Sequence, residues 1–247
     1  MSARPHPAWD HLILEEVDST NAEAARRFSG HPLWVVAKRQ TAGVGRRGRA
    51  WHGAEGNFFG SYICAPMCTP QVAAQHSFVA ALALRDAVAA LGLGAGLALK
   101  WPNDVLLDER KLAGILLESQ GQGNQITRLT VGIGVNLAAA PPQAQMEAGA
   151  MPAISLAERG APPAPEAFLD RLAPAFAHWT ARLQGDGFAP IRTAWLADAA
   201  RLGQEIQARL PRETVTGVFS TVDEAGALVL DTPDGKRVLH AADVNFP

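Results

Sequence analysis

The sequence predicts an α+β fold, in which a mixed sheet with helices is followed by a small β module. The apolar stretch 72–91 is long enough for a buried helix and ends at Gly92, a common helix terminator. Short strand-like segments follow it, and beyond Leu202 they become alternating strands joined by tight turns. A chain of 247 residues can hold one good-sized domain and one small one. We therefore expect two domains, residues 1–200 and 201–247.

Each expected element follows from local pattern. Thr69-Pro70 is a cap and first-turn pair for the long helix. The polar, glycine-rich segment 40–56 is expected to be a loop, and so is the Pro/Ala-rich segment 138–165. The predicted helices are 22–28, 72–91, 166–183 and 190–201. The predicted strands are 33–37, 57–64, 97–101, 105–107, 112–118 and 128–135 in the first domain, and 205–210, 214–222, 227–231 and 237–240 in a small barrel or sandwich.

Composition limits the classes of function. Charged residues make up 19% and hydrophobic residues 48%, which is ordinary for a soluble enzyme and too apolar for disorder. The net charge of -2 gives no overall positive field for DNA or anionic lipid. The N-terminus has no apolar run typical of a signal peptide, and Cys64 and Cys68 are too few for a disulfide framework. We expect free thiols, a cytoplasmic location, no membrane span and, since the histidines lack ligand spacing, no metal site built by the protein.

Residues 43–48 match the dinucleotide-binding pattern G-x-G-x-x-G, but their context argues against that function. The pattern requires a helix to open at its third glycine, and Arg49, Trp51 and Gly53 follow instead. An acidic residue about twenty positions further on is also missing. What remains is a loop in which guanidinium groups can bind phosphate or carboxylate oxygens.

The same loop is equally compatible with a solvated basic surface. Trp51 favours a ligand site, because an aromatic side chain can stack on a base or ring. A tryptophan buried for packing explains it almost as well.

Five segments in order carry a resemblance to a known family. They are Ser19-Thr20-Asn21, Gln40 to Trp51, Lys100-Trp101-Pro102-Asn103-Asp104-Val105, Lys111 to Glu118, and Val131-Gly132-Ile133-Gly134-Val135-Asn136. Together they resemble the biotin–protein ligases. The resemblance implies a catalytic domain like the core of class II aminoacyl-tRNA synthetases, followed by an SH3-like barrel. It also implies an ATP-dependent reaction that forms biotinyl-5′-AMP and transfers biotin to a lysine of the biotin carboxyl carrier protein of acetyl-CoA carboxylase.

The resemblance assigns roles to individual residues. Lys111 and Arg46 are expected to be catalytic, with Mg²⁺ accompanying ATP and Asn103 and Asp104 as nearby candidates to bind it. Gly114 is expected to leave room for the biotin ring. The biotin-binding residues would be Ser19, Thr20, Asn21, Gln40, Gly43, Val44, Gly45, Arg46, Lys111 and Gly114. The ATP-binding residues would be Arg47, Arg49, Trp51, Lys100, Asn103 and Asn136.

Two departures from the family matter. Val44 stands where members of the family usually have the first loop arginine, and its effect on retention of the intermediate is left open. Only 18 residues precede Ser19, too few for the helix-turn-helix of the repressor members, so we expect no DNA binding. A homodimer formed by edge-to-edge strand pairing is left open. The rival functions are a lipoate–protein ligase and a non-catalytic biotin sensor.

Overall fold

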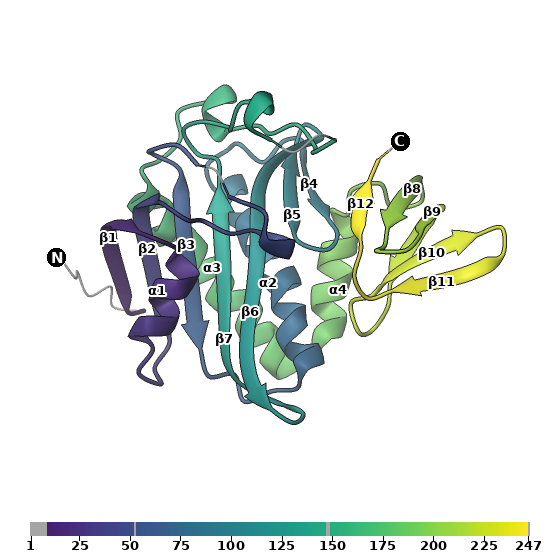
Figure 1. The fold of residues 1–247 in the computed structure, drawn as a ribbon, viewed down its shortest axis with the longest axis horizontal. Coiled ribbons are helices and arrows are strands. Elements are labelled where there is room, and N and C mark those ends of the chain that lie inside the picture. The colour runs from purple at the N-terminus through teal and green to yellow at the C-terminus, as the bar shows by residue number, and fades with distance from the viewer. Residues whose placement is uncertain (1–8, 52, 147–148, 247) are drawn as a thin grey trace.

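The computed structural model describes residues 9–51, 53–146 and 149–246, which form two β-sheets and four α-helices (Figure 1). The first eight residues, on which the expectation about a targeting segment depends, lie outside the described part. The predicted fold class is confirmed. The predicted division between residues 200 and 201 stays a prediction, although one sheet lies on each side of it.

The first sheet has seven strands in the order β1-β2-β3-β7-β6-β5-β4. Strand β1 runs parallel to β2, and every other neighbouring pair in this sheet is antiparallel, so the sheet is mixed. The sequence pattern did not predict β1, because this edge strand is only half-buried and lacks a clear alternation. The strands are β1 (His11–Val17), β2 (Leu33–Gln40), β3 (Phe58–Cys64), β4 (Leu97–Lys100), β5 (Asp104–Leu107), β6 (Arg110–Gln122) and β7 (Gln125–Val135).

Helices cover the two faces of this sheet unequally. The short helix α1 (Thr20–Arg27) lies on one face, while α2 (Pro70–Ala89) and α3 (Pro165–Asp186) pack together behind the other (Figure 1). Helix α2 starts as predicted, with the Thr69 side chain accepting a hydrogen bond from the amide of Val72. The face that carries α1 is left partly open, and the pocket described below lies there. None of the helices in the described ranges is both long and apolar enough to cross a membrane.

The second sheet has five antiparallel strands in the order β11-β10-β9-β8-β12. Its edge strands β11 and β12 are not paired with each other in the described residues, so the SH3-like module is open rather than a closed barrel. The strands are β8 (Glu205–Arg209), β9 (Thr214–Val222), β10 (Leu228–Thr232), β11 (Gly235–Leu239) and β12 (Asp243–Asn245).

Specific hydrogen bonds attach this module to the rest of the chain. The indole N–H of Trp101 donates to the carbonyl of Gly226 at 3.0 Å, and Arg192 of helix α4 (Phe188–Ala197) donates to the carbonyl of Val222 at 2.5 Å. Phe78 packs against Phe188 and Trp195 next to Gly226, in the turn between β9 and β10. These contacts attach the turn between β9 and β10, and β12 of the same sheet lies where it lines the pocket described below.

Candidate active site

A pocket of about 380 Å³ opens on the sheet face that carries α1. It is lined by the start of α1, by residues of the glycine/arginine loop (43–51), by β6 and β7, and by β12 of the second sheet. Gly43 and Arg47 are the two predicted site residues that do not line this pocket. The predicted residues that do line it are Ser19, Thr20, Asn21, Gln40, Val44, Gly45, Arg46, Arg49, Trp51, Lys100, Asn103, Lys111, Gly114 and Asn136.

One end of the pocket is lined by neutral hydrogen-bonding groups. The Gln40 Oε1 atom accepts a hydrogen bond from the Thr20 amide at 2.7 Å and lies 3.1 Å from the Thr20 hydroxyl oxygen. The Ser61 hydroxyl lies 2.8 Å from Thr20 Oγ1 and 2.6 Å from Asn21 Oδ1. The Asn21 amide nitrogen donates to Glu118 Oε2 at 2.7 Å. Because Thr20, Asn21 and Ser61 are all buried, their positions are fixed by this network.

Glycines form the floor of the pocket. A Cβ atom added to Gly134 would lie 2.5 Å from the Trp51 ring, and one added to Gly114 would lie 2.9 Å from it. A Cβ atom on Gly132 would lie 2.3 Å from Asn21 Oδ1. The Trp51 ring and the Asn21 amide therefore rest directly on the backbone of β6 and β7, which any larger residue at these positions would prevent.

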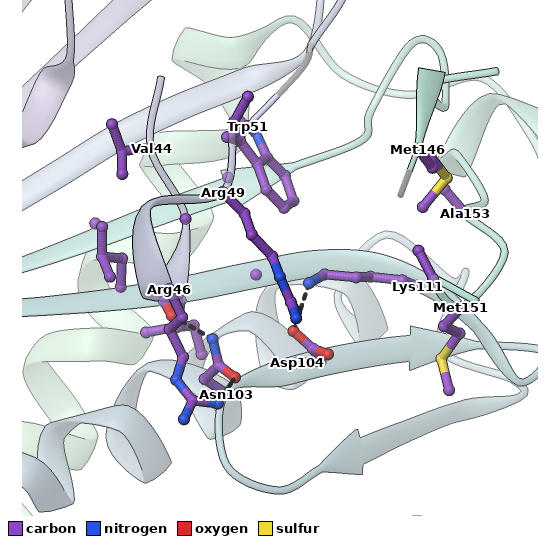
Figure 2. Close-up of a pocket in the computed structure, with 18 of the residues that line it drawn as sticks. Val44, Arg46, Arg49, Trp51, Asn103, Asp104, Lys111, Met146, Met151 and Ala153 are labelled. Atoms are coloured by element: carbon purple, nitrogen blue, oxygen red, sulfur yellow. Dashed lines mark hydrogen bonds and ion pairs between the residues drawn. The ribbon is translucent and has the colours of Figure 1, made fainter. Parts of the chain in front are cut away.

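The other end of the pocket is charged. Lys111 Nζ lies 2.7 Å from Asp104 Oδ1, and Lys100 Nζ lies 3.2 Å from Asp104 Oδ2. Burial by itself would raise the pKa of Asp104, but attraction to Lys111 and Lys100 outweighs it and lowers the pKa to about 2. The Lys111 ammonium also lies 5.5 Å from the centre of the Trp51 ring. The Lys111 side chain is thus held between a carboxylate and an aromatic face (Figure 2).

The glycine/arginine loop folds back on itself as a narrow hairpin. The amide of Gly45 donates to the carbonyl of Arg49 at 2.7 Å, and the amide of Trp51 donates to the carbonyl of Gly43 at 2.8 Å. Arg46, at the tip, donates to Asn103 Oδ1 at 3.3 Å and lies beside it in Figure 2. Burial lowers the pKa of Arg46 from its ordinary value. The predicted loop is present, and it contains a short 3₁₀ turn at Arg46–Gly48.

The two other loop arginines face the second sheet. Arg47 Nη1 and Arg49 Nη2 both donate to Asp243 Oδ2, at 2.6 Å and 3.0 Å. Arg209, Val244 and Asp243 line the pocket from β8 and β12. No local pattern predicted these contacts, because Asp243 is separated from the loop by almost 200 residues.

Asn136, which lines the pocket, carries one unused acceptor. Its amide nitrogen donates to the carbonyls of Ile154 at 3.2 Å and Lys111 at 3.4 Å. Its Oδ1 atom is buried and has no hydrogen-bond partner in the described residues. Since an orphan buried acceptor is costly, this atom is suited to a ligand N–H. Asn103 is more fully engaged, because its amide nitrogen also donates to the carbonyl of Ile115 at 2.7 Å.

The segment after β7, predicted only as a loop, forms a further wall. Lys111 exchanges backbone hydrogen bonds with it: its amide donates to the carbonyl of Pro152 at 2.8 Å, and its carbonyl accepts from Ile154 at 3.0 Å. Met146 and Met151 line the pocket on the opposite side of Lys111 from Arg46 (Figure 2). The segment has no periodic pattern, so sequence reasoning could not have placed it here.

The carboxylates of the pocket do not suit a protein-held metal ion. Asp104 is engaged with two lysines and Asp243 with two arginines. In the described ranges, no three His, Cys, Asp or Glu side chains gather around a common point. The geometry therefore does not fit a magnesium cage made of protein ligands.

The cysteines do not serve as nucleophiles here. Cys64 and Cys68 are free thiols on or just after β3 and neither lines the pocket. Burial raises the pKa of Cys64 to about 12, so it is a neutral thiol at physiological pH.

Comparisons with known proteins agree with this arrangement. Residues 14–136 match the family model for the Biotin/lipoate A/B protein ligase family, and residues 202–246 match the model for the Biotin protein ligase C terminal domain. A Biotin--[acetyl-CoA-carboxylase] ligase of Paracoccus denitrificans is 52% identical over 238 residues, covering 95% of this chain and 99% of that protein. The Bifunctional ligase/repressor BirA of Bacillus subtilis is 30% identical, covering 96% of this chain and 73% of that protein.

Solved structures share the fold. A biotin protein ligase from Aquifex aeolicus, in complex with biotin and ATP, superimposes with a TM-score of 0.81 at 24% identity, covering 95% of this chain and 97% of that one. At that identity the match supports the architecture alone, whereas the Paracoccus denitrificans relative extends the likeness to sequence over nearly the whole chain. The chain belongs to the biotin protein ligases.

Proposed function

We propose that the chain is an ATP-dependent ligase that joins biotin to a lysine of a carrier protein through biotinyl-5′-AMP. The observation that carries the proposal is a single pocket with a neutral hydrogen-bonding end at Thr20 and Gln40 and a cationic end at Lys111. Biotin has the matching polarity, with a neutral ureido ring at one end and a carboxylate at the other. The Paracoccus denitrificans relative carries the name of this activity.

In the first step, a biotin carboxylate oxygen attacks the α-phosphorus of ATP, the bond to the β-phosphate oxygen breaks, and pyrophosphate leaves. Negative charge builds on the phosphate oxygens during the attack. Lys111 is our candidate for neutralising that charge together with Arg46, since both are cations that line the pocket. Asp104 holds the Lys111 ammonium in place, so little reorganisation is needed as the charge develops.

The nucleotide would lie toward Trp51, Asn103, Asn136 and Lys100. The free Oδ1 atom of Asn136 supports this placement, because the exocyclic amino group of adenine needs an acceptor. Arg49 would meet phosphate oxygens by exchanging its contact with Asp243.

Magnesium bound to ATP would be held by phosphate oxygens and water, because the carboxylates of the site are already paired. Bound in this way it would offset phosphate charge. The side chains of this chain would orient the carboxylate and stabilise the oxygens.

In the second step, a neutral lysine amine of the carrier attacks the acyl carbon of biotinyl-5′-AMP, and AMP leaves with the bonding electrons. The absence of a nucleophilic thiol among the described pocket residues agrees with direct transfer. We propose the biotin carboxyl carrier protein of acetyl-CoA carboxylase as the acceptor, from the name of the relative. A cytoplasmic location and the lack of DNA binding stay predictions, and dimerisation stays open.

Pyrophosphate release tests the proposal. Purified protein with ATP and the carrier domain is expected to release pyrophosphate when biotin is added and to label the carrier. Lipoate in place of biotin is expected to give only background release. Release with lipoate alone would identify a lipoate ligase, and binding of biotin without release would identify a sensor.

A further inference from the structure

We propose that Glu118 is a positioning residue that sets the hydrogen-bond polarity of the neutral end of the pocket. Glu118 lies on β6, does not line the pocket, and is connected to it by a hydrogen bond from Asn21. The proposal rests on the proposed function and deepens it, because it names what makes this end select a ligand that carries N–H groups.

The first step of the argument is the orientation of the Asn21 amide. A carboxylate only accepts hydrogen bonds, so the Asn21 atom that lies 2.7 Å from Glu118 Oε2 must be the nitrogen. The Asn21 oxygen then faces Ser61 at 2.6 Å. Because that oxygen cannot donate, the Ser61 hydroxyl proton must point toward it.

The second step follows from counting protons. Ser61 has a single hydroxyl proton, so once it is given to Asn21, the 2.8 Å contact with Thr20 needs the Thr20 proton. The Thr20 hydroxyl therefore donates to Ser61. Gln40 Oε1 then accepts only the Thr20 amide and keeps a lone pair. Thr20 Oγ1 and Gln40 Oε1, both at the pocket wall, are left as acceptors for ligand N–H groups.

The reverse arrangement has the opposite consequence. If Asn21 were turned over, its nitrogen would donate to Ser61, Ser61 would donate to Thr20, and Thr20 would donate to Gln40. Gln40 Oε1 would then have both lone pairs occupied, and one lone pair of the Thr20 hydroxyl oxygen would be occupied by Ser61. Among the described members of the network, the acceptor at position 118 distinguishes the two arrangements, because Ser61, Thr20 and the Gln40 oxygen fit either.

Packing beneath Asn21 strengthens the case. The amide lies on Gly132, where a Cβ atom would be 2.3 Å from its oxygen, and Asn21 is 5% exposed. The side chain is therefore held in place and has two orientations available, related by a flip. Because Glu118 is exposed to solvent, it can be substituted with little risk to folding.

Three substitutions at one position test the proposal. Glu118→Lys presents a donor and favours the reverse arrangement, so we expect the Kd and KM for biotin to rise about tenfold or more. Glu118→Ala removes the group that favours one orientation of the Asn21 amide, and is expected to raise the Kd and KM for biotin severalfold. Glu118→Gln can still present an oxygen to Asn21, so values within about twofold of the unmodified protein are expected. The KM for ATP, and kcat at saturating biotin, should stay unchanged in all three.

Glu205→Lys, a matched change at an exposed strand glutamate of the second sheet, is the control and should leave every value unchanged. A biotin methylated on its ureido nitrogens gives a second measurement. It should bind the unmodified protein weakly, and its affinity should fall little further when Glu118 is replaced by Lys.

Biotin binding by Glu118→Lys as tight as that of the unmodified protein would overturn the proposal. So would an ATP KM that rises as much as the biotin KM. If the unmodified protein itself shows no biotin-dependent pyrophosphate release, the proposed function fails, and this proposal fails with it. Normal release by the unmodified protein with an unchanged Glu118→Lys variant removes the positioning role alone.

Discussion

The two ends of the pocket are built from different chemistry. At the neutral end, buried hydroxyls and amides such as Thr20, Asn21 and Ser61 satisfy one another through hydrogen bonds of 2.6 to 2.8 Å. At the charged end, lysine and arginine side chains are paired with Asp104 and Asp243. The neutral end is ready for a ligand as it stands, whereas two carboxylates at the charged end hold cations that a phosphate would also bind.

This difference predicts that the two ends of the pocket respond differently to salt concentration and pH. Neutral hydrogen bonds between buried groups respond little to salt or to pH near neutrality. Ion pairs respond to both, and the more exposed ones respond most. Recognition of the ureido ring should therefore be insensitive to ionic strength, while nucleotide binding and catalysis should depend on it.

The largest expected effect is at Lys111. Lys111→Ala removes one cation from the charged end, and we expect kcat for pyrophosphate release to fall by about 10²–10³-fold, the usual cost of losing one group that stabilises a developing oxyanion. Biotin affinity should fall much less, because the neutral end is untouched. Calorimetry and the pyrophosphate assay separate the two. Lys38→Ala, at an exposed lysine paired with Glu15, is the control. Unaltered turnover by Lys111→Ala would remove Lys111 from the mechanism.

Asp104→Asn is expected to have the next largest effect. It leaves two lysine ammonium groups close together without their shared anion, so stability should fall by about 3–5 kcal/mol. Denaturant unfolding at pH 7 measures this change.

The same residue predicts a pH dependence of stability. The pKa of Asp104 is lowered to about 2 in the folded chain from an ordinary value of 3.8. Ionisation of Asp104 therefore adds about 2 kcal/mol to the free energy of unfolding relative to the protonated side chain. This stabilisation is present above pH 4 and is lost as the pH falls toward 2. Asp104→Asn should flatten the acid side of the stability profile. An equally steep profile in the variant would show that other carboxylates account for it.

Gly134→Ala tests the floor that joins the two ends. The new methyl group would lie 2.5 Å from the Trp51 ring and must displace it. We expect the KM for biotin to rise about tenfold, with a change in tryptophan fluorescence. Gly185→Ala, which places a methyl group in open space on α3, is the control. It should change neither the KM for biotin nor the tryptophan fluorescence. A normal biotin KM for Gly134→Ala would mean that the ring position does not matter for binding.

The smallest effect is expected at Asp243. Asp243→Asn weakens the contacts with Arg47 and Arg49, which are partly exposed and contribute at most about 1 kcal/mol each. Because both arginines become freer to meet phosphate, the KM for ATP should fall about two- to fivefold at low salt. Titration with ATP at two ionic strengths measures it. A higher KM would indicate that Asp243 keeps the loop in its binding geometry.

Most of the secondary structure could be predicted from local sequence. The Thr69-Pro70 cap, the apolar run of α2 and the alternating strands of the second sheet each express a preference that operates within a few residues. Strand β1 was missed, because a half-buried edge strand has no clear periodicity. The barrel expected from the sequence is an open sheet, since pairing of its edge strands depends on distant backbone positions.

The candidate site divides in the same way. The sequence alone determined which residue types are present: a polar triplet at 19–21, a loop of glycines and arginines, a lysine after a turn, and glycines alternating along β7. Only the tertiary structure decided that Glu118 fixes Asn21, that Asp104 joins two lysines, and that Asp243 holds the loop arginines. The physical reason is that local preferences act along the chain, whereas hydrogen bonds and ion pairs depend on distances through space that folding alone creates.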